Sequence, residues 1–226
     1  MSNGEQFLQD ALLNASKLVE YSLIILCLMF AWTVAHLADR YISYLAATQQ
    51  TRSFRKERET LLKRDEWKSV LVLGEKLTRS HVAVVYSRAL REFDKGYEYI
   101  SSEQSLQAAS RVARIARNDL HEQLKRGLND LSAISRTAPF VGVFGTCIGI
   151  LDSFRGYAGS KSGYIAFLAM NLAEALVPTT VGLLVGVVAT WSYNWQNERL
   201  AVFDADMEIA SLELERYLKN QSPARS

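Results

Sequence analysis

Three apolar stretches, separated by highly charged sequence, constrain this chain more than any other feature. The first runs from Tyr21 to Ala38 without Asp, Glu, Lys or Arg, and its 18 residues are about the shortest helix that spans a bilayer. The second runs from about Leu131 to Phe154. The third, from Ser162 to Asn197, has Glu174 as its one charged side chain and is long enough to project beyond the membrane. This pattern predicts an all-α integral membrane protein with three transmembrane helices.

Composition excludes several other classes of protein. Apolar residues make up 49% and charged residues 22% of the chain, which is typical of a folded protein rather than a disordered tail. The two cysteines, Cys27 and Cys147, lie far apart in apolar sequence and form neither a disulfide framework nor a zinc site. A net charge of +2 is too small to indicate nucleic-acid binding. No catalytic or phosphate-binding motif stands out, so we expect no enzyme, no cofactor and no metal site.

The distribution of positive charge predicts the orientation in the membrane. Eighteen of the 26 Lys and Arg residues lie between Arg40 and Asp130, whereas Gly156–Gly163 contains only Lys161. Because positively charged segments stay on the cytoplasmic side, we expect 40–130 inside, and the N-terminus and Gly156–Gly163 outside. Residues 5–19 place apolar side chains on one helical face and are net acidic, which predicts an amphipathic surface helix rather than a cleaved signal peptide.

The segments between the spans also have helical periodicity. Ser101 followed by Gln104 predicts a capping box that opens a long helix running without a break into the second span. Residues 51–78 and 80–95 predict two further helices, and 198–219 continue the third span. The apolar positions expected to be buried are Leu106, Ala109, Ala113, Ala116, Leu120, Leu124, Leu128 and Leu131, and then Leu200, Phe203, Met207, Ala210, Leu214 and Leu218.

Small and hydroxylated residues recur at helical spacing in the second and third spans. They are Ser135, Ala138, Gly142, Thr146, Gly149 and Ser153, and then Asn171, Ala175, Thr179, Gly182, Gly186 and Thr190. Such faces allow close helix packing in lipid. The alternative is that they line a wet or protonatable path. They also suggest a homo-oligomer that encloses a central pore.

The presence of Glu174 in the third span favours the second interpretation, a wet or protonatable path, over helix packing alone. A carboxylate at membrane depth costs about 2.5–3.5 kcal/mol on insertion scales, so it is retained where it functions or has a partner. The alternative is an ion pair with Lys161 or Arg155. Pro178 has no N–H and should free the carbonyl of Glu174, just as Pro139 should free that of Ser135, unless each proline only kinks its helix.

The spacing of two threonines places them near one another. Thr146 and Thr179 are equidistant from the turn between the second and third spans, so they should lie at one depth on facing helices. By the same reasoning Glu174 is level with Asp152, roughly 7–8 Å outward of the threonines by helical rise. An acid outward of two hydroxyls predicts a proton or cation relay.

Two runs of sequence carry a resemblance to a known family. Residues 138–150 (APFVGVFGTCIGI) resemble the second-span signature, and residues 173–183 (AEALVPTTVGL) the third-span signature, of the MotA/TolQ/ExbB proton channel family, TolQ/ExbB-like branch. The layout of spans also matches. By position Thr146 and Thr179 match the family's pore threonines and Glu174 its membrane glutamate. Further candidates for the pathway or for gating are Thr180, Asn171, Asp152, Pro139 and Pro178.

The resemblance implies a proton-channel or stator subunit in the bacterial inner membrane. It implies a homopentameric ring around a TolR/ExbD-like dimer whose single-span helices carry a membrane aspartate. Proton flow would drive motion that a TolA/TonB-like protein transmits to the outer membrane in a Tol-Pal or TonB system for protein transport. The alternatives are a non-conducting membrane scaffold of an envelope complex and a Na⁺-driven version of the same stator.

These inferences predict one order of segments along the chain. We expect a periplasmic amphipathic helix (1–20), a first transmembrane helix (21–39), a cytoplasmic helical domain (40–130), a second transmembrane helix (131–155), a periplasmic loop (156–163), a third transmembrane helix (164–195), and a cytoplasmic C-terminal helix and tail (196–226). The second and third helices should extend into the cytoplasmic domain.

Overall fold

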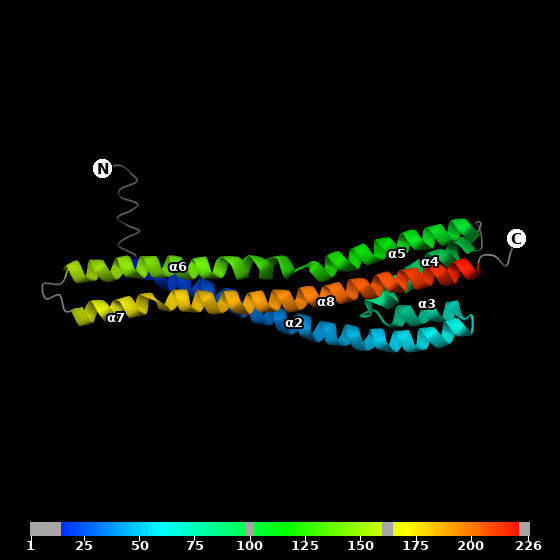
Figure 1. Ribbon diagram of the computed structural model, residues 1–226, viewed down its shortest axis with the longest axis horizontal. Helices are drawn as coiled ribbons and strands as arrows, with labels where there is room; N and C mark the ends of the chain where they lie inside the picture. Colours follow the sequence, from blue (N-terminus) through cyan, green and yellow to red (C-terminus); the bar gives the residue numbers. More distant parts are fainter. Residues whose placement is uncertain (1–14, 98–101, 160–164, 222–226) are drawn as a thin grey trace. The chain divides into compact units, whose positions relative to one another are not determined.

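The computed structural model describes residues 15–97, 102–159 and 165–221, and every regular element in these ranges is a helix (Figure 1). In chain order the helices are α2 (Ala15–Lys63), α3 (Trp67–Lys76), α4 (His81–Tyr97), α5 (Ser102–Lys125), α6 (Leu128–Gly159), α7 (Ile165–Ala175) and α8 (Val177–Gln221). Three helical stretches are long and apolar enough to cross a membrane: Ser16–Lys63, Glu103–Arg155 and Leu168–Asn220. The all-helical class and the three candidate spans are therefore confirmed.

The helices form two compact units. Unit 1 comprises residues 1–37 and 127–194, and unit 2 comprises residues 38–126 and 195–226. Both α2 and α8 contribute one part of their length to each unit, whereas α3, α4 and α5 up to Lys125 belong to unit 2. The apolar spans thus fall in unit 1 and most of the charged sequence falls in unit 2.

Unit 1 is built on close contacts between α2, α6 and α8. Its buried core contains Leu26 of α2, Ala138 of α6 and Val185 of α8. Large apolar side chains on the outside of the same helices are exposed, among them Phe140 at 74% and Val187 at 68%. Such an apolar exterior is what helices need if lipid or another protein surrounds them.

Unit 2 has a larger core of its own, in which α2, α3, α4, α5 and α8 take part. Phe54 of α2 packs edge-on against Tyr86 of α4, with ring centroids 5.5 Å apart, and both side chains are fully buried. The positions predicted to face inward are buried, with the exception of the half-buried Leu106, which supports the helical periodicity. In this unit they are Ala109, Ala113, Ala116, Leu120, Leu124, Leu200, Phe203, Met207, Ala210, Leu214 and Leu218, and in unit 1 they are Leu128 and Leu131.

Two predictions of continuous helices were wrong. The helix expected to run unbroken into the second span ends at Lys125, and α6 begins at Leu128. Gly127 between them has φ 84°, a left-handed conformation that costs a glycine little and ends a helix. The helix expected over 51–78 is also interrupted, because α2 continues to Lys63 and Asp65 then takes φ 61°.

Several expectations fall partly or wholly on residues outside the described ranges. These include most of the amphipathic helix over 5–19, the capping residue Ser101, and the end of the loop over 156–163. The beginning of that loop differs from the prediction, since α6 continues to Gly159.

Candidate functional site

The two threonines singled out by their spacing lie against one another in unit 1. The hydroxyl oxygen of Thr146 on α6 is 2.5 Å from that of Thr179 on α8. Thr146 is 9% exposed and Thr179 is half-buried. The two helices therefore bring both hydroxyls to one depth, and this part of the prediction is confirmed. The part that the two residues play in an ion pathway stays a prediction.

Glycines next to the pair hold the two helices at close range. A Cβ added at Gly142 would lie 2.6 Å from the carbonyl oxygen of Pro178 and 3.1 Å from the Cα of Thr179. One added at Gly182 would lie 2.7 Å from the carbonyl oxygen of Ala138. These neighbours are backbone atoms, so only glycine fits at this spacing. The small-residue faces of the second and third spans thus pack on each other within the chain, and they no longer argue for a contact between copies.

A polar cavity of about 370 Å³ lies beside the end of α7. Its lining includes the carboxylates of Asp152 on α6 and Glu174 on α7, together with Asn171. Glu174 is exposed, whereas Asp152 and Asn171 are half-buried. The sequence placed Glu174 and Asp152 at one level, and the cavity brings them together. Ser16 and Ser153 add hydroxyls to the same wall.

The third span is interrupted between the cavity and the threonine pair. Helix α7 ends at Ala175 and α8 begins at Val177, so Leu176 falls between two helices. The break lies just before Pro178, which cannot donate a backbone hydrogen bond. Beyond the break regular helical bonding resumes, because Thr180 donates both its N–H and its hydroxyl to the carbonyl of Leu176, at 3.2 and 3.3 Å. By contrast α6 continues through Pro139, which packs against Gly186.

One residue of this site was missed in the sequence. Ser22 of α2 is 3% exposed, donates to the carbonyl of Val19 at 2.7 Å, and lies where a Cβ on Gly145 would be. The sequence feature that could have identified Ser22 is its hydroxyl inside an otherwise apolar span. Among the described residues, no group of three or more His, Cys, Asp or Glu side chains is arranged to hold a metal ion.

Known proteins resemble part of this chain. A family model described as the MotA/TolQ/ExbB proton channel family matches residues 81–209. The Tol-Pal system protein TolQ of Pseudomonas aeruginosa is 32% identical over 117 residues, which are 51% of this chain and 51% of that protein. The biopolymer transport protein ExbB of Neisseria gonorrhoeae is 34% identical over 108 residues, 46% of this chain and 49% of that protein. For ExbB of Pseudomonas putida the identity is 37% over 91 residues, 40% and 28% of the two chains. The chain thus matches about half the length of these curated relatives, or less.

Proposed function

This chain belongs to the MotA/TolQ/ExbB proton channel family, and we propose that it is the proton-conducting stator subunit of an inner-membrane motor that couples the proton motive force to work at the outer membrane. Its three apolar helices and its TolQ and ExbB relatives make it a multi-pass inner-membrane protein. Its role is transport rather than enzyme catalysis.

The observation that carries this proposal is the Thr146–Thr179 hydroxyl pair. A threonine hydroxyl both donates and accepts a hydrogen bond, so two of them in contact can hand on a proton. The cavity with Glu174 and Asp152 supplies carboxylates that can take up a proton on the outer side. The interruption at Leu176 lies between these two groups and leaves the backbone there less regular than in a continuous helix.

The assembly that we propose follows from the family resemblance. Five copies form a ring around a TolR/ExbD-like dimer, whose membrane aspartate exchanges protons with the threonine pair. A TolA/TonB-like protein then transmits the motion to the outer membrane. The N-terminus is periplasmic and the C-terminus cytoplasmic, because positive charge is concentrated between Arg40 and Asp130.

The test replaces each hydroxyl of the pair by a methyl group. Thr146→Val and Thr179→Val keep the side-chain shape, so we expect normal yield of the assembled complex but loss of proton-driven envelope function in cells that carry each variant as the sole copy. Thr137→Val and Thr190→Val are matched controls on α6 and α8. Their hydroxyls donate to carbonyls of their own helices, at 2.9 Å to Ala133 and 2.8 Å to Gly186, and we expect both controls to remain active.

Other outcomes separate the alternatives. Full activity of both pair variants would favour a non-conducting scaffold, and loss of assembly would make the threonines packing residues. Function that follows a Na⁺ gradient after the proton gradient is collapsed would favour a Na⁺-driven stator. Glu174→Gln removes the titrating group at nearly constant volume. We expect it to abolish function, whereas a mild effect would indicate only an ion pair with Arg155 or Lys161.

A further inference from the structure

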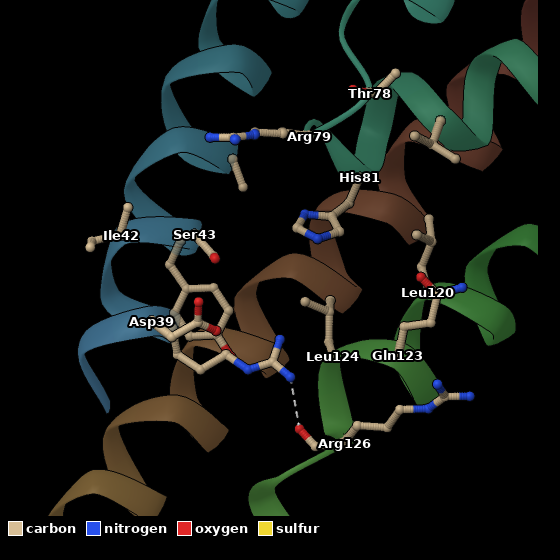
Figure 2. A pocket seen from close by; sticks show the side chains of 14 residues that line it. Asp39, Ile42, Ser43, Thr78, Arg79, His81, Leu120, Gln123, Leu124 and Arg126 are labelled. Carbon is tan, nitrogen blue, oxygen red and sulfur yellow. Dashed lines mark hydrogen bonds between the residues drawn. The ribbon is translucent and has the colours of Figure 1, made fainter. Parts of the chain in front are cut away.

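Unit 2 contains a second cavity, of about 660 Å³, that the proposed proton pathway does not use. It opens between α2, the α3–α4 connection, α4 and α5 (Figure 2). Figure 2 shows Arg79 and Arg126 on opposite sides of this space, with the ring of His81 between them. Several side chains of the lining are apolar, including Leu120 and Leu124, so one part of the cavity wall is hydrophobic and another part is charged.

The charge of the lining is positive. Arg40, Arg79 and Arg126 contribute three guanidinium groups, against the single carboxylate of Asp39. Other arginines of this unit are neutralised, as in the pair of Arg55 with Asp206 at 2.6 Å. None of the three cavity arginines forms an ion pair within the described part of the chain. An excess of guanidinium groups around a cavity favours an anionic ligand with oxygen acceptors.

Buried donors in the wall are also left without partners. The hydroxyl of Tyr44, a residue 4% exposed, has no hydrogen-bond partner among the residues that the structure describes. The same holds for Nε of Arg40, although its Nη2 donates to the carbonyl oxygen of Arg126 at 3.0 Å. Buried polar atoms normally have a partner, so each such exception calls for an explanation. Two in one cavity wall, beside an unbalanced positive charge, indicate a ligand.

The position of the cavity along the chain selects the kind of ligand. Asp39 and Arg40 directly follow the first apolar span on the same helix, and Arg126 comes just before α6, which carries the second. Tyr41 is 52% exposed and its ring lies 5.7 Å from that of Trp195. Tyr and Trp side chains of this kind concentrate where a membrane meets water. Basic pockets at this level on the cytoplasmic side bind anionic lipid headgroups.

We propose that this cavity binds the phosphate headgroup of an anionic lipid. Arg40, Arg79 and Arg126 supply the positive charge, and the hydroxyl of Tyr44 supplies a hydrogen bond to the same ligand. The apolar part of the wall accommodates the first carbons of the acyl chains. A soluble phosphate ester shares the headgroup's chemistry, and the experiment separates these two sources.

The test measures which lipid the full chain retains. The protein is reconstituted into nanodiscs that contain equal amounts of phosphatidylglycerol and phosphatidylcholine, and native mass spectrometry then counts the lipids that stay bound. We expect phosphatidylglycerol to be retained in preference. Arg79→Gln and Arg126→Gln should each weaken its retention about fivefold, which corresponds to about 1 kcal/mol for one arginine at an anionic surface. Arg64→Gln changes an exposed arginine in the turn just after α2 and should have no effect.

Three results would overturn the proposal. They are equal retention of the two lipids, equal effects of Arg64→Gln and the two cavity variants, and equal thermal stabilisation of delipidated protein by inorganic phosphate and by phosphatidylglycerol. Arg79→Lys and Arg126→Lys keep the charge and should restore most of the retention. They, together with circular dichroism, distinguish lost binding from lost folding.

Discussion

Gly142→Ala tests whether the close approach of α6 and α8 holds the threonine pair together. The added Cβ would lie 2.6 Å from the carbonyl oxygen of Pro178, and its next neighbours are the Cα atoms of Thr179 and Gly182, at 3.1 and 3.2 Å. All three are backbone atoms, which cannot rotate away. The helices must therefore move apart.

The size of the effect follows from these distances. An ordinary C···O contact is about 3.3 Å, so the helices must separate by roughly 0.7 Å at this point. The same displacement takes the Thr146–Thr179 oxygens from 2.5 Å to roughly 3.2 Å, beyond the usual O–H···O range. Overpacking costs about 1–3 kcal/mol, and alanine returns up to about 1 kcal/mol in helix propensity. We expect a net loss of roughly 1–2 kcal/mol.

The assay is unfolding of the detergent-solubilised protein, followed by circular dichroism, together with envelope function in cells. Gly186→Ala is the matched comparison, because its nearest neighbours are ring carbons of Pro139, at 3.0 and 3.2 Å, rather than backbone. We expect it to lose less stability than Gly142→Ala. If Gly142→Ala is as stable as the parent, or if the two variants lose the same amount, close backbone packing does not set the geometry of the threonine pair.

Two further predictions concern unit 2. Burial lowers the pKa of His81 below its usual 6.5, and the charge of Asp204 only partly offsets this. The unfolded chain therefore takes up a proton that the folded protein does not, so stability should fall as the pH is lowered through 6.5, and His81→Phe should flatten this part of a Tm-against-pH curve. The hydroxyl of Ser80 caps α4 by accepting from the N–H of Ala83 at 3.2 Å and contacts the hydroxyl of Thr51 at 2.9 Å. Ser80→Ala should cost about 1–2 kcal/mol in thermal unfolding, and an unchanged midpoint would contradict the capping role.

The sequence predicts the periodic features of this fold well. Apolar residues at spacings of three and four identify the buried stripe of α5 and α8 down to individual positions such as Ala113 and Met207. Helix ends are harder to predict from the sequence, because they depend on single residues in unusual backbone conformations. An aspartate such as Asp65 tolerates a positive φ but does not require it, so nothing in the sequence alone marks the end of α2 at Lys63.

In the candidate site, too, some features can be predicted from the sequence and others cannot. The level of Thr146 with Thr179 follows from counting residues from a turn, since both helices rise at a fixed rate. The proximity of Ser22 does not follow from any count, because it depends on where α2 packs against α6. Pro178, which lacks an N–H, indicates the break at Leu176 from the sequence. Pro139 lacks the same donor but lies inside a continuous helix. Proline alone therefore does not decide where a span is interrupted.

The small-residue faces of α6 and α8 have two interpretations, helix packing and a polar path, and the structure shows close backbone packing at the glycines and a hydroxyl contact at the threonines. Gly142 and Gly182 bring two backbones together, whereas Thr146 and Thr179 use that closeness to bring two hydroxyls into contact. Substitutions of the glycines and of the threonines should therefore have different effects on stability and function. Replacing a glycine should lower stability and function together, because the helices separate. Replacing a threonine by valine should leave stability nearly intact and remove function alone. If both kinds of variant lost stability to the same extent, the faces would serve packing throughout, and the proposed proton path through the threonine pair would be refuted.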